Sequence, residues 1–310
     1  MRNSLTAIVP CFNEAEVIEI TYQRLHAVAK GLPVPCKILF VNDGSSDSTG
    51  ELLDRIAASD SSVEVLHFSR NFGHQPAVCA GIEHCTTDMA VILDADLQDP
   101  PELIPEMIDT MVREEADVVY CVRRHRDGET FFKKFTAKVF YRVLNYMSEV
   151  SLPVDTGDFR LVSRRVINEF CRLPERQKYV RGLMAWVGFH QVPFYYDRKA
   201  REAGGTKYPL SKMISLSLIS LLYFSTKPLK LALMFGFLAV VFSLGLLLWS
   251  FFGKIFGFTN ADSGWTSLFV VVIFFSGVQL ITIGLVGMYV GNIFNEVKRR
   301  PQYVVKREED

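Results

Sequence analysis

The sequence predicts an α/β fold with a mostly parallel, doubly wound sheet, followed by two membrane-spanning helices. Over the first 125 residues, short apolar runs alternate with helical stretches. Such alternation is typical of βαβ units with right-handed crossovers. After residue 208 the chain becomes strongly apolar. Two stretches there hold no charged residue, and each exceeds the ~20 residues that a helix needs to cross a bilayer.

The composition agrees with this division. The chain has 310 residues with 34 Lys+Arg and 34 Asp+Glu, so its net charge near zero gives no sign of a nucleic-acid partner. Hydrophobic residues make up 49% of the chain and the mean hydropathy is +0.17, an excess that lies after residue 208. The six cysteines form no CxxC pair, so buried thiols in a reducing compartment are expected. The N-terminus enters a strand pattern directly, and no signal peptide is expected.

The elements of the first part follow from its apolar runs and helical periodicity. Strands are expected at residues 5–11, 36–42, 63–68, 89–94 and 117–122. Helices are expected at residues 15–30, 48–59, 76–85 and 101–115, and Pro76 and Pro101 suit a first helical turn. Farther on, strand character returns at 157–163 and 190–196, with a helix at 164–173.

Two further stretches are predicted as helices that lie in a membrane interface. Residues 129–150 place phenylalanines on one helical face and basic residues on another. This pattern is typical of an interfacial amphipathic helix, and packing on the sheet is the alternative. Residues 209–226 are apolar with scattered serines and are predicted as a second, juxtamembrane helix.

Transmembrane helices are predicted at residues 229–253 and 266–291. Basic residues precede the first span and follow the second, whereas the connecting loop holds only Lys254 and Asp262. The positive-inside rule then places both termini in the cytoplasm, including the domain of residues 1–208 and a basic tail of residues 292–310. Two buried helices of a soluble protein are the alternative, which the uncharged length of both argues against. A GxxxG spacing at 287–291 is compatible with a homo-oligomer.

Polar side chains follow three of the predicted strands. Residues 10–14 (Pro-Cys-Phe-Asn-Glu) end the first strand, residues 41–47 end the second, and residues 94–98 (Asp-Ala-Asp-Leu-Gln) end the fourth. Open α/β sheets bind ligands at the carboxyl ends of their strands, so these groups can converge on one nucleotide. Singly, each motif is also compatible with an ordinary turn.

The residue types suggest roles within this set. Two acids separated by one residue need a positive partner, and the expected one is a hard divalent cation that carries substrate phosphates. Its expected ligands are Asp96 and Gln98, with Asp94 on either the metal or a ribose. Base and ribose contacts are expected from Phe12, Glu14 and Asp43. The basic, glycine-containing loop at 198–208 suits phosphate groups, although a solvated linker is the alternative.

Together these motifs resemble glycosyltransferase family 2, with its GT-A fold. The resemblance rests first on residues 8–14, 41–47 and 94–100. Residues 157–161 (Gly-Asp-Phe-Arg-Leu), the loop at 201–208 and the two C-terminal spans resemble the polyprenyl-phosphate glycosyltransferases. That subgroup includes bactoprenol glucosyltransferases and dolichyl-phosphate mannose synthases. The resemblance covers essentially the whole chain, and the two-span tail is most similar to the bactoprenol type.

The resemblance implies inverting transfer of one sugar from a nucleotide diphosphate sugar to a polyprenyl phosphate, with Mg²⁺ or Mn²⁺. The expected substrates are UDP-glucose and undecaprenyl phosphate, and the expected location is the cytoplasmic face of the plasma (inner) membrane, in a multi-pass protein. GDP-mannose with a dolichyl-type phosphate is the alternative. A processive polysaccharide synthase would need a Gln-x-x-Arg-Trp motif, which residues 177–182 do not supply. A non-catalytic membrane scaffold is opposed by the intact Asp94-x-Asp96.

The resemblance also carries roles onto individual residues. The catalytic set is Asp158, Asp96 and Arg160. The metal ligands are Asp94, Asp96 and Gln98. The donor-binding set is Pro10, Phe12, Glu14, Val41, Asp43, Asp94, Ala95, Arg201 and Lys207. From their own chemistry, the expected acceptor-phosphate set is Arg160, Arg123 and Arg124. For Arg123 and Arg124, contact with anionic lipid headgroups or a plain solvated edge are the alternatives.

A phosphate acceptor lowers the need for a general base. Its second pKa is roughly 6, so it is largely anionic at neutral pH. A carboxylate beside that anionic phosphate is unfavourable because the two negative charges repel each other. Asp158 is therefore either a base or a group that orients the acceptor. Asp155 is an alternative for the acid of this pair. Arg160 is expected to grip two phosphate oxygens, and His74 to make a structural hydrogen bond.

Overall fold

The computed structural model describes residues 4–123, 156–176, 178–197, 226–256 and 265–306. It divides into a unit that holds the sheet and a unit that holds two long apolar helices. Two predicted elements lie outside the described residues, namely the helix at 129–150 and the helix at 209–226 apart from its last residue. The same is true of several predicted site residues: Arg124, Asp155, Arg201 and Lys207.

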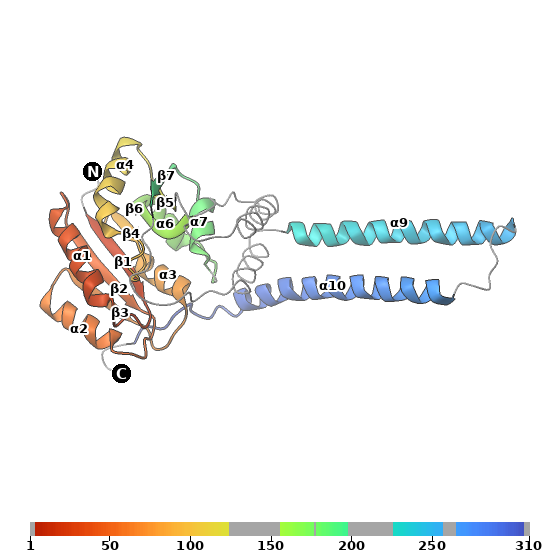
Figure 1. Cartoon of the computed structure of the whole chain (residues 1–310), viewed down its shortest axis with the longest axis horizontal. Helices are drawn as coiled ribbons and strands as arrows, with labels where there is room; N and C mark the ends of the chain where they lie inside the picture. Colours follow the sequence, from red (N-terminus) through yellow and green to blue (C-terminus); the bar gives the residue numbers. More distant parts are fainter. Residues whose placement is uncertain (1–3, 124–155, 177, 198–225, 257–264, 307–310) are drawn as a thin grey trace. The chain divides into compact units, whose positions relative to one another are not determined.

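A seven-stranded sheet forms the centre of the first unit (Figure 1). Its strands are β1 (Leu5–Cys11), β2 (Cys36–Asn42), β3 (Val63–His67), β4 (Met89–Ile92), β5 (Val118–Arg123), β6 (Thr156–Ser163) and β7 (Gln191–Tyr196). The strand order is β3-β2-β1-β4-β6-β5-β7, and β6 alone among them runs antiparallel to its neighbours. The prediction of a mostly parallel α/β sheet is confirmed.

The predicted helices of this unit are present with shifted ends, and one short helix was missed. The helices are α1 (Ile18–Gly31), α2 (Thr49–Ser59), α3 (His74–His84), α4 (Ile104–Arg113), α6 (Arg164–Arg172) and the unpredicted α7 (Val180–Trp186). A 3-10 turn, η1 (Pro101–Leu103), replaces the expected start of α4. Helix α1 starts later than predicted because the Val17 and Ile18 N–H groups first close a turn onto the Glu14 carbonyl.

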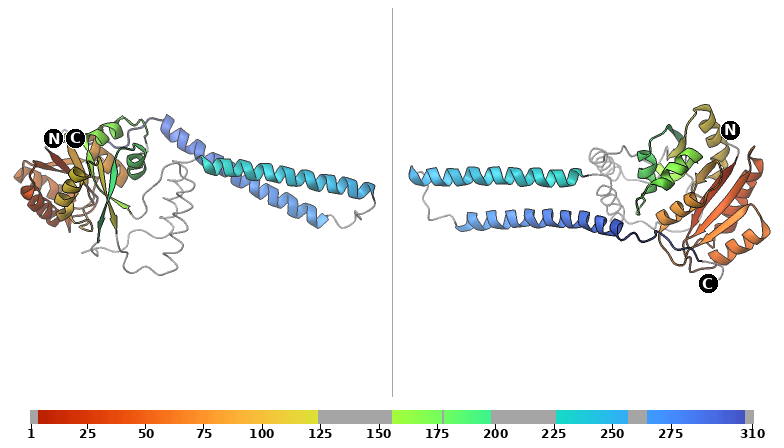
Figure 2. Two further views of the ribbon diagram at one scale, coloured as in Figure 1. Left: turned by 90° about the horizontal axis from the view of Figure 1, so that it is seen from above. Right: turned by 180° about the vertical axis from the view of Figure 1, so that it is seen from behind.

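Helices cover both faces of the sheet (Figure 2). Along β2, Ile38 and Phe40 face one buried cluster while Leu39 and Val41 face the other, as the alternation of a strand requires. The first cluster contains apolar residues of α1, α2 and α4, and the second contains Ala77 and Ala80 of α3. The strands are therefore buried on both sides, which explains their continuous apolar runs.

The second unit consists of α9 (Lys227–Ile255) and α10 (Trp265–Val297). Both helices are long and apolar enough to cross a membrane, with mean hydropathies of 1.9 over Lys227–Gly245 and 2.2 over Val271–Val297. The predicted spans at 229–253 and 266–291 lie within these helices. Helix α10 also includes residues 292–297, which were predicted as part of the tail; no proline interrupts the sequence before Pro301.

The described end of the chain packs on the sheet unit. Val305 forms an antiparallel bridge with Phe68, directly after β3, which is an edge strand of the described sheet. The Ser69 N–H donates to the Val304 carbonyl at 2.9 Å, and the Lys306 N–H donates to the His67 carbonyl at 2.8 Å. The predicted basic tail is thus an integral part of the sheet unit over these residues.

The packing of α3 on β1 gives a first testable prediction. A Cβ on Gly81 would lie 2.2 Å from the Ile8 Cγ2 atom in a fully buried position. Gly81→Ala is therefore expected to push α3 from the sheet and to lower the free energy of unfolding by about 1–3 kcal/mol. Denaturant unfolding of the full chain in detergent measures this loss.

The matched control for that variant is Gly31→Ala at the end of α1. A Cβ there meets nothing within 4 Å. Its unfolding free energy is expected to stay within a few tenths of a kcal/mol of the original chain or to rise slightly. Equal stability of the two variants would show that α3 is not packed as closely as described.

Candidate active site

The three polar loops that were predicted to meet lie side by side at one edge of the sheet. β1 pairs in parallel with both β2 and β4, so the carboxyl ends of these strands face the same edge. Backbone hydrogen bonds join the strand ends: the Asp43 N–H donates to the Cys11 carbonyl at 2.9 Å, and the Leu93 N–H donates to the Ile8 carbonyl at 3.1 Å. The topology therefore allows groups from all three loops to act on one ligand.

Each of these loops contains one residue with left-handed backbone: Asn13 (φ 54°), Gly44 (φ 63°) and Leu97 (φ 60°). A glycine tolerates this conformation, whereas a leucine pays roughly 1–2 kcal/mol for it. Strain of this kind is concentrated at functional sites. Leu97 stands between Asp96 and Gln98, so the strained residue belongs to the carboxylate motif itself.

Asp43 is buried and holds the start of α3 in place. Its carboxylate accepts the Phe72 N–H at 2.6 Å and the Gly73 N–H at 2.9 Å. Burial raises the pKa of Asp43, and these two amides and nearby cations offset the rise only in part. The contact between Asp43 and a base or ribose stays a prediction. Its observed bonds fix the two residues that directly precede His74.

A buried ionic cluster lies on the α3 side of the sheet, centred on Asp158 of β6. The carboxylate of Asp158 is 3% exposed and binds Arg181 of α7 in a two-pronged arrangement. Arg181 Nε donates to Oδ1 at 2.7 Å and Nη2 donates to Oδ2 at 3.0 Å. His74 Nε2 lies 3.1 Å from Asp158 Oδ2 and 3.6 Å from Asp94 Oδ1. His74 and Arg181 thus enclose Asp158 from the starts of two helices.

This arrangement shifts the pKa of each member. Burial alone would raise the pKa of Asp158, but Arg181 and His74 outweigh it and hold that pKa well below its usual range. Burial would lower the pKa of His74, yet Asp158 and Asp94 raise it to about 9, so the imidazole is charged at neutral pH. Burial raises the pKa of Asp94 to about 6, although His74 opposes this rise.

Arg160 adds a third cation to the same face of β6, two residues beyond Asp158. Its side chain is buried and donates to the Gly157 carbonyl at 3.1 Å, while its Nε makes no hydrogen bond among the described residues. Burial lowers the pKa of Arg160 and Asp158 opposes this effect. A buried guanidinium with a spare donor is suited to an anionic ligand.

The Asp94-x-Asp96 motif offers oxygen ligands for a divalent cation. Asp94 Oδ1 is buried and makes no hydrogen bond to any described residue, and Asp96 Oδ1 accepts the Gln98 N–H at 3.2 Å. Within the described ranges, no group of three or more His, Cys, Asp or Glu gathers around a common point. The buried Asp94 Oδ1 and the Asp96 carboxylate are oxygen donors of the kind that suits a hard cation such as Mg²⁺, which commonly takes one or two carboxylates together with substrate phosphates.

The other predicted residues differ in where the structure places them. Phe12 is 40% exposed in the first loop, whereas Pro10, Val41 and Ala95 are buried in the loops or strands beside it. The Glu14 N–H donates to the Thr49 hydroxyl oxygen at 2.9 Å. Arg123 ends β5. The predictions for Arg124, Arg201 and Lys207 lie outside the described residues.

Sequence reasoning missed Arg181 and the partner of His74. Arg181 lies within residues 177–182, which offered only a failed match to another motif. The available signal was an arginine directly after Tyr179-Val180 at a helix start, too weak to assign. The expected hydrogen bond of His74 exists, and its partner is the functional candidate Asp158.

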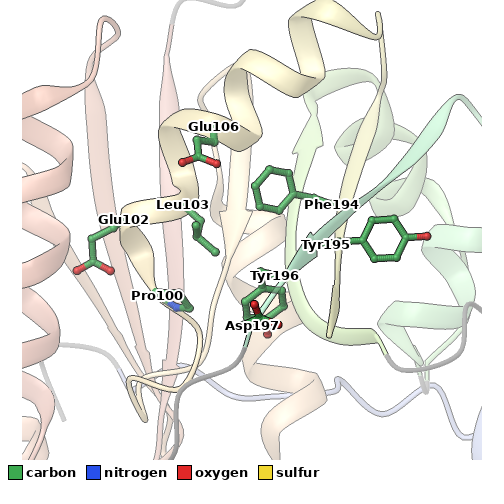
Figure 3. A pocket seen from close by; sticks show the side chains of 8 residues that line it. All are labelled: Pro100, Glu102, Leu103, Glu106, Phe194, Tyr195, Tyr196 and Asp197. Carbon is green, nitrogen blue, oxygen red and sulfur yellow. The ribbon is translucent and has the colours of Figure 1, made fainter. Parts of the chain in front are cut away.

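A separate pocket of about 530 Å³ lies between the start of α4 and the end of β7 (Figure 3). Figure 3 shows Phe194 and Tyr195 on opposite sides of β7. The Tyr196 hydroxyl beside it donates to the Asp99 carboxylate. The lining includes three carboxylates and no cation: Glu102, Glu106 and Asp197. It is unsuited to phosphate and does not include the Asp158 cluster.

Comparison with known proteins first defines the class. The crystal structure of glucosyl-3-phosphoglycerate synthase from Mycobacterium tuberculosis in complex with Mn²⁺, UDP and phosphoglyceric acid has a TM-score of 0.51 to this chain. The match is 20% identical and covers 71% of this chain and 77% of that one. The sheet unit therefore has the GT-A fold of glycosyltransferases.

Sequence similarity then gives the family. The sequence model of "Glycosyl transferase family 2" matches residues 6–171. A Bacillus subtilis (strain 168) protein called uncharacterized glycosyltransferase YkcC is 47% identical over 300 residues, 97% of this chain and 92% of the relative. A Shigella flexneri SfII prophage-derived bactoprenol glucosyl transferase is 37% identical over 303 residues, 98% of this chain and 97% of the relative. The chain belongs to glycosyltransferase family 2 and is a glycosyltransferase.

The cluster predicts how stability depends on Arg181 and pH. Arg181→Gln leaves Asp158 buried with one cation fewer, and we expect the free energy of unfolding at pH 7 to fall by about 2–4 kcal/mol. Because the folded-state pKa of Asp158 is depressed, its contribution is present above the unfolded pKa of about 3.9 and is lost as pH falls through the folded value. The difference between the two proteins should therefore shrink below about pH 4, as measured by urea unfolding in detergent.

Arg165→Gln is the control for this experiment. Arg165 is 70% exposed and lies 3.9 Å from Asp117, so its removal should change stability by less than about 1 kcal/mol. A loss for Arg181→Gln that is the same at pH 7 and pH 3 would contradict the ionic account of the cluster.

Proposed function

We propose that this protein transfers one glucose, with inversion, from UDP-glucose to a polyprenyl phosphate such as undecaprenyl phosphate. The observation that carries the proposal is the engagement of Asp158, whose two carboxylate oxygens are bound by Arg181 and His74. A carboxylate held in this way is a weak base, so the site suits an acceptor that is already ionised. Similarity over the whole chain to a bactoprenol glucosyl transferase supports glucose and a lipid acceptor.

The acceptor phosphate needs no proton removed near neutral pH, because its second pKa is roughly 6. What it needs is a cationic place beside the carboxylates. His74, Arg160 and Arg181 supply three positive charges around Asp158 and Asp94. In this mechanism Asp158 orients Arg181 and His74, and Arg160 offers its spare Nε–H to a phosphate oxygen. Arg123 and Arg124 would extend the same acceptor site.

The donor would bind across the three loops at the edge of β1, β2 and β4. Phe12, Glu14 and Asp43 would contact its nucleoside, and Arg201 and Lys207 would contact its phosphates. The residues that would hold a divalent ion, Mg²⁺ or Mn²⁺, are Asp94, Asp96 and Gln98. Such an ion, when bound, neutralises the charge that develops on the leaving nucleoside diphosphate. Asp94 Oδ1, which is buried and makes no hydrogen bond to a described residue, supports this assignment.

Membrane attachment would bring the lipid phosphate to the site. The two apolar helices α9 and α10 separate the sheet unit from residues 302–306, yet those residues pack on the sheet unit. If both helices cross a membrane, the chain leaves and returns on the same side, so this packing supports the proposal of two crossings. The excess of Lys and Arg beside the ends of the helices supports a cytoplasmic site in the plasma membrane.

A transfer assay with the purified full chain tests the donor. UDP-glucose, UDP-galactose, UDP-N-acetylglucosamine and GDP-mannose are each paired with undecaprenyl phosphate in the presence of Mn²⁺. We expect glucose transfer to exceed every other by at least about tenfold in kcat/KM, which corresponds to 1.4 kcal/mol of discrimination. Preferred transfer of mannose would replace the proposal with a GDP-mannose-dependent enzyme, and no transfer to the lipid would overturn it.

The metal assignment is tested by Asp96→Asn and by chelation. Loss of the charge clamp is worth several kcal/mol, so kcat is expected to fall on the order of 10²–10³-fold in the variant. EDTA should cause a similar loss in the original chain, reversed by Mg²⁺ or Mn²⁺. The control is Asp109→Asn, because Asp109 is an exposed residue on α4. The activity of this variant should equal that of the original chain. Full activity of Asp96→Asn would exclude the metal site.

A further inference from the structure

Tyr303 in the C-terminal tail packs against the apolar cluster that contains Phe68 and Ala77 and Ala80 of α3. Its ring stacks on Phe68, with ring centroids 4.9 Å apart and an interplanar angle of 11°. Its hydroxyl donates to Glu83 Oε2 at 2.8 Å. The backbone that follows this residue is held by the bridge between Val305 and Phe68. The tail therefore presents one aromatic ring to the sheet unit in a defined position.

The ring contact leads directly to the donor loops. Phe68 is 3% exposed and meets Phe72 edge to face at 5.8 Å. The Phe72 and Gly73 N–H groups donate to Asp43. The segment between these two phenylalanines also packs on the second loop, because a Cβ on Gly44 would lie 2.3 Å from the Arg70 carbonyl carbon. Tyr303 thus packs on Phe68, at one end of residues 68–73, the segment whose other end binds Asp43 and packs on the Gly44 loop.

The hydroxyl contact leads to a second, separate set of groups. Glu83 on α3 also pairs with Lys178, whose Nζ lies 3.3 Å from Glu83 Oε1. Lys178 is 7% exposed and precedes α7, the helix that carries Arg181. The two contacts of Tyr303 can be separated experimentally, since Tyr303→Phe removes only the hydroxyl.

We propose that Tyr303 is a positioning residue for the nucleotide donor, acting through Phe68 and Phe72 on the loop that holds Asp43. The inference rests on the proposed use of that loop by the donor. Residues 298–301 connect this tail directly to α10. The apolar helix is therefore linked, through the chain and the Tyr303 ring, to the segment that contains Phe68 and Phe72. The tail then does more than cover the edge of β3: it sets the affinity for the nucleotide.

The first test needs no ligand. Hydrogen exchange of the full chain in detergent is compared for the original protein, Tyr303→Ala, Tyr303→Phe and Val304→Ala. Val304 is 47% exposed and contributes its carbonyl to the tail contact, which makes it a matched control. We expect amides of residues 70–73 to exchange roughly threefold to tenfold faster in Tyr303→Ala, the range that an aromatic pair contributes. Tyr303→Phe and Val304→Ala should exchange as the original chain does.

The second test measures UDP and GDP binding and the two Michaelis constants. Tyr303→Ala should raise the Kd of the bound nucleotide and the donor KM by roughly threefold to tenfold, while the acceptor KM stays unchanged. A purely structural role would lower kcat through loss of folded protein and leave both constants unchanged. Tyr303→Leu, which fills much of the same space, replaces Tyr303→Ala where that variant does not fold.

The outcomes separate this inference from the proposed function. Unchanged exchange at residues 70–73 in Tyr303→Ala, or equal nucleotide affinity, overturns the role of Tyr303 even if glucose transfer occurs. Faster exchange together with weaker nucleotide binding supports it, whichever of the two nucleotides binds. Failure of the original chain to bind either nucleotide would overturn both, because no donor would then be positioned.

Discussion

The neutralisation of one buried carboxylate organises this site. Asp158 lies in the interior of the sheet unit, where an unpaired charge is strongly unfavourable. Its two cations come from different helices, so α3 and α7 must both begin beside β6. The Gln75 side chain joins these beginnings by accepting the Val180 N–H at 2.9 Å. The ion pairs therefore fix helix positions as well as charge.

In the proposed function, the donor and acceptor sides of the site would share a short piece of backbone. Asp43 binds the amides of Phe72 and Gly73, and the next residue, His74, contacts Asp158 and Asp94. If a donor bound at Asp43 displaced residues 72 and 73, the adjacent His74, one of the cations beside Asp158, would move as well. The dense packing around Gly44 makes such a displacement concerted, because the loop cannot move without the Arg70 backbone.

The parts of the fold that depend on local pattern could be predicted from the sequence. Apolar runs fixed most strands to within two residues, and their polar ends located the edge where the loops meet. The position of β6 between β4 and β5 depends on contacts across the sheet and has no local signature. The same holds for Arg181, which is recognisable only beside Asp158, and for Tyr303, whose partner Phe68 is far away in the sequence. The left-handed backbone of Leu97 could not be predicted from the sequence, since leucine rarely adopts a positive φ.

The electrostatics of the cluster bear on the chemistry of the acceptor. A general base works best when its pKa lies near the working pH, whereas the pKa of Asp158 is held well below its usual range by Arg181 and His74. Removal of a proton from a sugar hydroxyl would have to disrupt two ion pairs and would gain little driving force. An ionised phosphate needs no proton removed, so Arg181 and His74 can stay paired with Asp158. Their positive charge then attracts the phosphate, which is the nucleophile. A site whose carboxylate is held in ion pairs is better suited to binding an acceptor that is already an anion than to deprotonating a neutral one.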